Sequence, residues 1–135
     1  MLLLDSSAMV KRYIAEEGTN LVLHAMEIDE DWVASALLRT ESRIALCRQP
    51  LSRSVQESIA ARLADDWARF LVVDVDSECL EVASEIGCAH GLRSLDAVHL
   101  AAGDRLPRPC SFVTFDARQR EAARALGFDV VPVDA

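Results

Sequence analysis

The chain has 135 residues, 51% hydrophobic and 27% charged, which is the composition of one globular domain spanning residues 1–135, without disordered or collagen-like bias. Its opening apolar run, residues 1–4, is too short for a signal peptide or a membrane span, so we expect a cytoplasmic protein with no membrane partner. The formal net charge of −8 argues at first against nucleic acid, because phosphate binding usually needs a basic surface.

Apolar runs and helical periodicities alternate along the chain. The opening run MLLL is unbroken, as expected for a strand covered on both faces of a parallel sheet. Strands are expected at residues 1–4, 31–35, 71–75, 111–115 and 128–133. Helices are expected at residues 6–16, 19–28 (where LVL also suits a strand), 35–48, 54–70, 77–91, 94–105 and 117–127. This alternation predicts right-handed crossovers and an α/β fold, with about five parallel strands between two layers of helices.

Four cysteines are spread along the chain without a C-x-x-C pair or zinc-type spacing: Cys47, Cys79, Cys88 and Cys110. Small buried hydrophobic positions are the usual place of a free cysteine. We therefore expect all four to be reduced core residues rather than disulfides or metal ligands.

Four acidic residues are expected near the carboxyl edge of the sheet. Asp5 follows the first strand, and Asp116 follows the fourth strand in SFVTFD. Glu41 lies about one turn into the helix after the second strand, and Asp96 lies in the first turn of its helix. Because binding sites in parallel sheets form outside the carboxyl ends of the strands, these acids are candidates for one site.

Each acid also has a purely local interpretation. Asp5 and Asp116 are suited to cap the helices that follow them, and Ser6 is an alternative cap for the first. Asp96 is favoured by the dipole of its own helix, and a lone Glu41 is ordinarily a solvated surface residue paired with arginine. What favours a site is the coincidence of four acids at one edge.

Four clustered carboxylates would repel one another and lose stability unless cations neutralised them. Oxygen ligands suit Mg²⁺ or Mn²⁺, which bridge to substrate phosphates, and two such ions can hold the attacking water and the leaving oxygen of a phosphoryl displacement. Two bound divalent cations would also bring the net charge from −8 to −4, which weakens the objection to a nucleic-acid substrate. The predicted chemistry is phosphodiester hydrolysis.

The motifs together resemble those of a known family. DSSAMVKRY at the start, the Glu in SALLRTESRIAL, SLDAVHLAA, and VTFD followed by ARALGFDVV are similar to PIN-domain ribonucleases of the VapC toxin type. Each motif alone is weak, but the four occur in the family's order and spacing, and the resemblance covers essentially the whole chain.

The resemblance implies a three-layer PIN fold and a hydrolase of RNA, an endoribonuclease that depends on Mg²⁺ with Mn²⁺ able to substitute. Asp5, Glu41, Asp96 and Asp116 stand at the family's acidic catalytic and metal-binding positions, and Thr114 stands where a hydroxyl residue often orders the site. The resemblance also implies that the protein is a toxin held inactive by a VapB-type antitoxin, whose tail occupies the acidic site. Toxins of this family are commonly homodimers, so a homodimer is expected here.

Several further residues are candidates for binding substrate or ordering the site. Arg93, just before SLDA, suits either an RNA phosphate or an ion pair with one of the acids. Lys11 and Arg12 suit an RNA groove, although solvated surface charge is the more frequent role, and Ser6 joins this group. His99 lies one helical turn after Asp96, and its apolar surroundings favour a packed, hydrogen-bonded histidine over a metal ligand.

Three alternative functions match parts of the pattern. An aspartate-nucleophile or metal-dependent phosphatase also places an acid after an opening strand, but it needs a second acid two residues later, where this chain has Ser7. A phosphate-accepting regulator needs a late lysine, and no lysine follows Lys11. A non-catalytic RNA- or protein-binding module of the same fold is the alternative from a different class.

Overall fold

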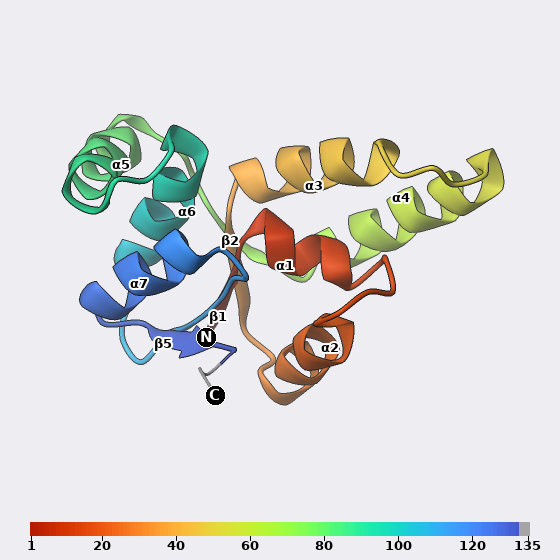
Figure 1. Cartoon of the computed structure of the whole chain (residues 1–135), viewed down its shortest axis with the longest axis horizontal. Coiled ribbons are helices and arrows are strands. Elements are labelled where there is room, and N and C mark those ends of the chain that lie inside the picture. Colours follow the sequence, from red (N-terminus) through yellow and green to blue (C-terminus); the bar gives the residue numbers. More distant parts are fainter. Residues whose placement is uncertain (133–135) are drawn as a thin grey trace.

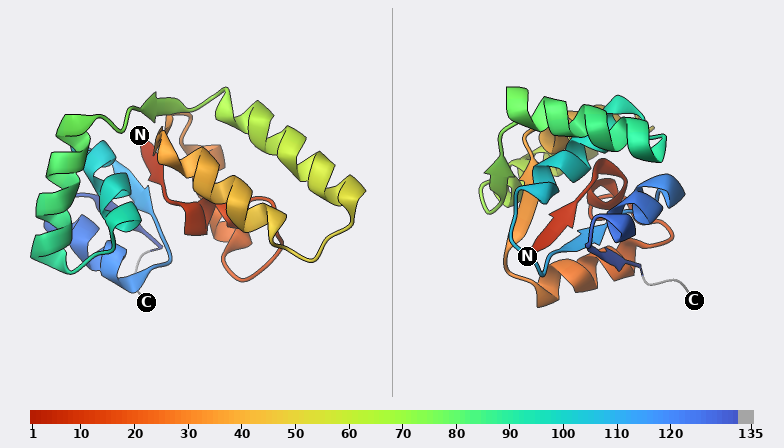
Figure 2. Two further views of the ribbon diagram at one scale, coloured as in Figure 1. Left: turned by 90° about the horizontal axis from the view of Figure 1, so that it is seen from above. Right: turned by 90° about the vertical axis from the view of Figure 1, so that its left-hand side faces the viewer.

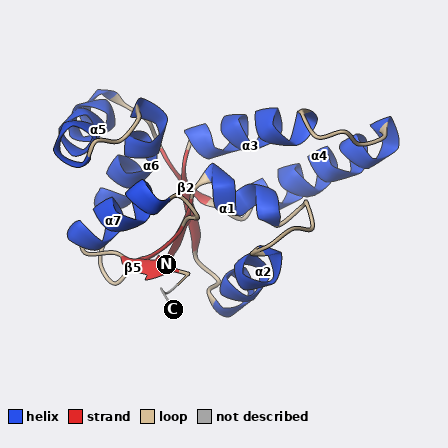
Figure 3. Cartoon of the chain, viewed as in Figure 1, coloured by secondary structure: helices blue, strands red, loops and turns tan. Residues whose placement is uncertain are grey.

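The structure is a computed structural model that describes residues 1–132, so Val133 of the predicted last strand lies outside the described residues. Figure 1 shows the arrangement of the elements, and Figure 3 separates helices from strands. The strands are β1 (Leu2–Leu4), β2 (Trp32–Ser35), β3 (Leu71–Val73), β4 (Ser111–Val113) and β5 (Asp129–Val131). The helices are α1 (Ser6–Lys11), α2 (Thr19–Ile28), α3 (Leu37–Cys47), α4 (Arg53–Trp67), α5 (Ser77–His90), α6 (Ser94–Asp104) and α7 (Ala117–Ala125).

The five strands form one parallel sheet in the order β3-β2-β1-β4-β5. The first strand is central because Leu2 pairs with Trp32 of β2 on one side and with Ser111 of β4 on the other. The chain builds outward from β1 through β2 and β3, and then returns to build β4 and β5 on the opposite side. The direction of winding therefore reverses between β1 and β4, which is where open α/β sheets bind ligands. The predicted α/β fold class is confirmed.

Helices cover both faces of this sheet, and the two faces bury separate hydrophobic cores. Alternation along β1 divides its side chains, since Leu3 packs into the core beneath α5, α6 and α7, whereas Leu2 and Leu4 pack into the core beneath α1 to α4. This two-sided burial explains why the opening run is apolar at every position. Figure 2 shows the layers from two further directions.

Helix α6 approaches β1 more closely than a side chain would permit. Gly103 lies in α6, and a Cβ atom at this position would collide with the side chain of Leu3 and with the ring of Phe128. Gly103 lies in the last turn of α6, and the lack of a side chain there lets the helix backbone lie close to the sheet. This contact fixes the height of α6, the helix that carries Asp96 and His99.

The observed ends of several elements differ from the predicted ones. Helix α1 stops at Lys11 instead of residue 16, because the hydroxyl of Thr19 donates to the Ile14 carbonyl and accepts from the Glu16 N–H, which holds the connection to α2 as a turn. Strand β3 has only three residues of the expected five. The cap of α5 is Asp76, whose carboxylate accepts from the Cys79 N–H at 2.9 Å, and Ser77 is already the first helical residue.

The prediction for the cysteines is half correct. All four are free thiols, as expected, but only Cys79 and Cys110 are buried, while Cys47 and Cys88 are exposed. Across residues 1–132, the helices are too short or too polar to cross a membrane.

Candidate active site at the carboxyl edge of the sheet

The carboxylate of Asp5 is buried at the carboxyl end of the central strand, with 3% of the residue exposed. Its Oδ1 accepts hydrogen bonds from the Ser7 hydroxyl at 2.7 Å and the Ala8 N–H at 3.0 Å, and its Oδ2 accepts one from the Thr114 hydroxyl at 2.7 Å. The bond from Ala8 makes Asp5 the N-cap of α1. The local interpretation of this residue is therefore correct, and it accounts for only one of the three bonds.

Burial raises the pKa of Asp5 because the charged form is poorly solvated. The hydrogen bonds from Thr114, Ala8 and Ser7 act in the opposite direction and do not cancel the rise. A buried carboxyl group whose ionisation is opposed by its own surroundings is typical of functional sites, where a cation or substrate supplies the missing stabilisation.

Thr114 connects Asp5 to the helix that follows β4. Its hydroxyl oxygen lies 2.9 Å from Oε1 of Gln119 and accepts the Asp116 N–H at 3.2 Å. The Gln119 amide nitrogen in turn donates to the backbone carbonyl of Asp96 at 3.2 Å. A chain of polar groups, buried at Asp5, Thr114 and Gln119, thus runs from the end of β1 through the end of β4 and α7 to α6.

Asp96 lies in the first turn of α6, and Arg93 forms an ion pair with it at 3.3 Å. Arg93 is the N-cap residue of this helix, and its side chain makes no capping hydrogen bond. The Arg93 side chain is 84% exposed, so the pair contributes little stability and the guanidinium group can exchange this partner for another anion. Of the two predicted roles for Arg93, the structure contains the ion pair.

Glu41 extends from α3 toward α6, where its Oε1 forms a short contact with Nε2 of His99. The histidine is 1% exposed, and its Nδ1 lies 3.1 Å from the hydroxyl of Ser35 at the end of β2. His99 is a packed, hydrogen-bonded residue, as the sequence favoured, and one of its partners is a predicted catalytic acid.

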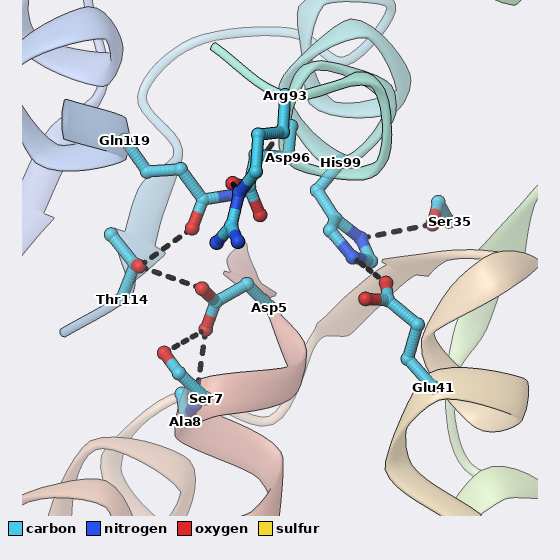
Figure 4. A network of polar contacts seen from close by, with 10 residues as sticks. All are labelled: Asp5, Ser7, Ala8, Ser35, Glu41, Arg93, Asp96, His99, Thr114 and Gln119. Carbon is cyan, nitrogen blue, oxygen red and sulfur yellow. Dashed lines mark hydrogen bonds and ion pairs between the residues drawn. The ribbon is translucent and has the colours of Figure 1, made fainter. Parts of the chain in front are cut away.

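Asp5, Glu41 and Asp96 face one common space in Figure 4, although they come from β1, α3 and α6, and the Arg93 guanidinium reaches into this space. The Asp116 carboxylate caps α7 by accepting the Gln119 N–H at 2.9 Å, and the Asp116 N–H donates to the Thr114 hydroxyl that bonds Asp5. Within residues 1–132, no three His, Cys, Asp or Glu side chains form a group that could hold a metal ion. The predicted cluster of four acids is thus an arrangement of three around one space, with the fourth held at a helix end.

The remaining candidates have structural partners. Arg12 forms two hydrogen bonds with Asp66 of α4, at 2.8 and 3.2 Å, so its guanidinium group is engaged within the fold. Lys11 donates to Glu16 at 3.1 Å and lies over the ring of Phe115. Ser6 is the half-buried first residue of α1.

Comparison with known proteins decides the family. The PIN domain family matches residues 2–125. Ribonuclease VapC46 of Mycobacterium tuberculosis (strain ATCC 25618 / H37Rv) is 35% identical over 132 residues, covering 95% of this chain and 94% of the relative. The chain belongs to the VapC family of PIN-domain ribonuclease toxins. The resemblance seen in the sequence is therefore confirmed.

Solved structures of other toxins share the VapC-type fold of this chain. A toxin-antitoxin complex from Klebsiella pneumoniae matches with a TM-score of 0.73 at 14% identity, and VapC20 of Mycobacterium tuberculosis, a sarcin-ricin loop cleaving toxin, matches with a TM-score of 0.72 at 18% identity. Each match covers 100% of both chains. At these identities the likeness shows the fold alone.

The donor atoms of this PIN domain fit a hydrated hard cation better than a metal held only by protein. Mg²⁺ usually keeps several waters and is bound through one or two carboxylates together with substrate phosphates. Asp5 and Asp96 supply oxygen ligands of that kind on two sides of the common space, and the burial of Asp5 gives a cation an electrostatic reason to bind.

Sequence reasoning missed four residues that organise this VapC-type site. Ser7, Gln119 and Ser35 each form a hydrogen bond with a predicted site residue or with its partner. For His99, the sequence predicts a packed, hydrogen-bonded residue but does not reveal that Glu41 is its partner. Only Ser7 had a usable signal, because a hydroxyl two residues after an N-cap can reach the cap's carboxylate. The others come from segments far from their partners in sequence.

Proposed function

We propose that this PIN domain is an endoribonuclease whose hydrolysis of RNA phosphodiester bonds requires Mg²⁺, with Mn²⁺ able to substitute, and that Asp5, Glu41 and Asp96 form its active site. The supporting observation is the Asp5 carboxylate, which lies buried at the carboxyl edge of the sheet and whose pKa is raised by that burial. Glu41 and Asp96 face the same space from two other elements. When bound, the cation would supply an activated water and neutralise charge on the phosphate.

The chain's own groups have distinct roles in this proposal. Thr114 and Ser7 hold the Asp5 carboxylate in one orientation through two 2.7 Å hydrogen bonds. Gln119 ties the backbone of Asp96 to Thr114, which keeps the two acids at a fixed separation. Arg93 can leave Asp96 when substrate arrives and contact an RNA phosphate through its planar donors.

Asp116 has a smaller role here than the sequence predicted. One of its carboxylate oxygens is committed to the N-terminus of α7. We therefore assign it to holding the segment that carries Thr114, and leave direct cation binding to Asp5 and Asp96, with Glu41 completing the site.

We also propose that a VapB-type antitoxin inhibits this chain in the cytoplasm by placing a basic side chain among the carboxylates, and that the toxin is a homodimer. The Klebsiella pneumoniae relative was crystallised as a toxin-antitoxin complex. In this chain, a groove between α3 and α4 offers a surface for such a protein. Its lining includes the apolar side chains of Ile59 and Leu63 and the basic side chains of Arg39, Arg43 and Arg53.

The phosphatase alternative loses support from the position of Ser7. Where that chemistry needs a second acid, this hydroxyl donates to Asp5 and accepts the Phe115 N–H at 3.2 Å, so it is part of the scaffold. A non-catalytic module remains as a possible outcome of the following experiment.

The test uses purified full-length chain, freed of any co-purified partner, incubated with total RNA in Mg²⁺, in Mn²⁺ or in EDTA. We expect cleavage with either metal, none in EDTA, and none by the Asp5→Asn variant. Sequencing of the cleaved ends then identifies the RNA target. Unchanged cleavage in EDTA would refute the metal dependence, and metal-independent binding of RNA without cleavage would favour the non-catalytic module.

A further inference from the structure

His99 connects three elements of the fold at a single buried point. It lies on α6 one turn after Asp96, with Nδ1 3.1 Å from the Ser35 hydroxyl of β2 and Nε2 in short contact with Glu41 of α3. The residue is 1% exposed, and Ser35 is fully buried. Both ring nitrogens therefore have a protein partner, and the orientation of the imidazole is fixed.

The chemistry of these partners determines how the hydrogens are arranged. An ionised carboxylate only accepts hydrogen bonds, so Nε2 must carry the hydrogen that points at Glu41. In the neutral ring Nδ1 is then an acceptor, and the Ser35 hydroxyl donates to it. The Glu41 carboxylate thus selects the tautomer, and the Ser35 hydroxyl, which can donate, satisfies the other ring nitrogen. Such outer partners commonly orient the carboxylates and imidazoles of metal sites.

Glu41 needs this support more than the other acids do. The Asp5 side chain is short and receives three hydrogen bonds. A glutamate side chain has one more rotatable bond, and that of Glu41 is 20% exposed. Ordering a long side chain of this type costs conformational entropy, which a fixed hydrogen-bond partner offsets. Figure 4 shows the contact with His99 at one carboxylate oxygen, while the other oxygen is directed toward Asp5.

We propose that His99 is a positioning residue for the nuclease reaction, which holds Glu41 by one oxygen so that the other faces the space shared with Asp5 and Asp96, with Ser35 bonded to the opposite ring nitrogen. This inference rests on the proposed function, because it assigns a part in that reaction to Glu41. It differs from a packing role for His99, since packing depends on the volume of the ring and positioning depends on one nitrogen.

Two substitutions separate these roles because they keep different nitrogens. The amide nitrogen of Gln in His99→Gln can occupy the place of Nε2 and donate to Glu41, whereas the shorter amide of His99→Asn reaches only the place of Nδ1, near Ser35. Both variants lose the ring and one hydrogen bond, so similar melting temperatures are expected. His24→Asn, at an exposed position on α2, controls for loss of a histidine elsewhere.

The readouts are RNA cleavage, the dissociation constant for Mn²⁺ measured by electron paramagnetic resonance, and melting temperature. We expect His99→Asn to lose about 10- to 100-fold in cleavage or Mn²⁺ affinity, the range typical of outer partners of a metal site. His99→Gln should retain most of both, and His24→Asn all of both. Equal losses in the Gln and Asn variants, or full activity in His99→Asn, would overturn the inference.

A third measurement stands even if a variant fails to fold. Long-range ¹H–¹⁵N spectra of the wild-type chain report the tautomer of each histidine, and His99 should carry its hydrogen on Nε2; a hydrogen on Nδ1 alone would refute the arrangement. If wild-type protein cleaves no RNA, the proposed function fails, while the tautomer and the Mn²⁺ affinities still decide how His99 acts on Glu41.

Discussion

The hydroxyl of Thr114, at the end of β4, donates a 2.7 Å hydrogen bond to the carboxylate of Asp5, at the end of β1, although 109 residues separate the two in sequence. This bond crosses the point where the winding of the sheet reverses. It therefore ties the two halves of the fold together at the candidate active site.

Replacing Thr114 by Val keeps the shape of the side chain and removes this donor. We expect Thr114→Val to lower cleavage about 10- to 100-fold, as for outer partners of metal sites, and to lower the free energy of unfolding by about 1–3 kcal/mol because buried acceptors lose their partner. Thr114→Ser keeps the hydroxyl and is the matched control. Wild-type cleavage rates in the Val variant would show that Asp5 does not depend on this bond.

Asp5 gives a prediction on stability against pH. Its folded pKa lies above the ordinary value of 3.8, so its ionisation opposes folding at neutral pH, and this unfavourable contribution disappears below that value. In EDTA, Asp5→Asn should therefore melt at a higher temperature than wild type at pH 7, with the difference vanishing below pH 3.8. Calorimetry across this range is the measurement. A variant that is less stable than wild type at pH 7 would contradict the raised pKa.

Adding Mn²⁺ extends the same experiment. Bound cation should raise the melting temperature of the wild-type chain and leave Asp5→Asn almost unchanged, because a ligand that binds only the folded state stabilises it. Equal shifts in both proteins would place the cation elsewhere.

The two acids at helix starts should respond differently to substitution. Asp96→Asn should reduce cleavage by more than about 100-fold, beyond the range of outer partners, and should abolish the growth arrest expected when the toxin is expressed alone. Asp116→Asn should remain active within about tenfold, because asparagine caps a helix as well as aspartate does. Cleavage assays and growth curves of both variants provide the comparison. Equal loss of cleavage in both variants would indicate that Asp116 also binds the cation.

Gly103 should tolerate no side chain. In Gly103→Ala, the new methyl group would meet the Leu3 side chain and the Phe128 ring, and such overpacking costs about 1–3 kcal/mol. Gly87→Ala, on the adjacent α5, is the control, since its nearest neighbours would lie at 3.5 Å and alanine favours helix by up to about 1 kcal/mol. Urea unfolding of the two variants should therefore give changes of opposite sign.

The ionised carboxylate of Asp66 should stabilise the folded state above pH 3.8 and lose this effect in acid. Burial raises the pKa of Asp66, but hydrogen bonds from Arg12 and Tyr13 outweigh it, and the net pKa lies below the ordinary 3.8. Its contribution is thus present above pH 3.8 and is lost as the pH falls further. Asp66→Ala should cost about 1–3 kcal/mol at pH 7 in urea unfolding, and clearly less at pH 3. The same loss at both values would show that the contacts of Asp66 act without its charge.

The sequence was sufficient for the fold, because apolar runs mark buried strands. It could not decide between a capping and a cation-binding role for Asp116, since a capping aspartate and a catalytic one have the same local pattern. Nor could it assign the partners of Arg12 and His99, because Asp66 and Glu41 lie 54 and 58 residues away. Such pairs depend on how helices pack across the sheet, which periodicity does not encode.

The hydrogen bonds around Asp5 also limit how its carboxylate can bind a cation. A carboxylate has about four lone pairs in its plane, and here Oδ1 uses two for Ser7 and Ala8 while Oδ2 uses one for Thr114. A single lone pair on Oδ2 remains. Asp5 can therefore offer one-point, monodentate ligation and never a chelating grip, so any geometric selectivity for one ion over another must come from water, from the other acids and from the substrate itself.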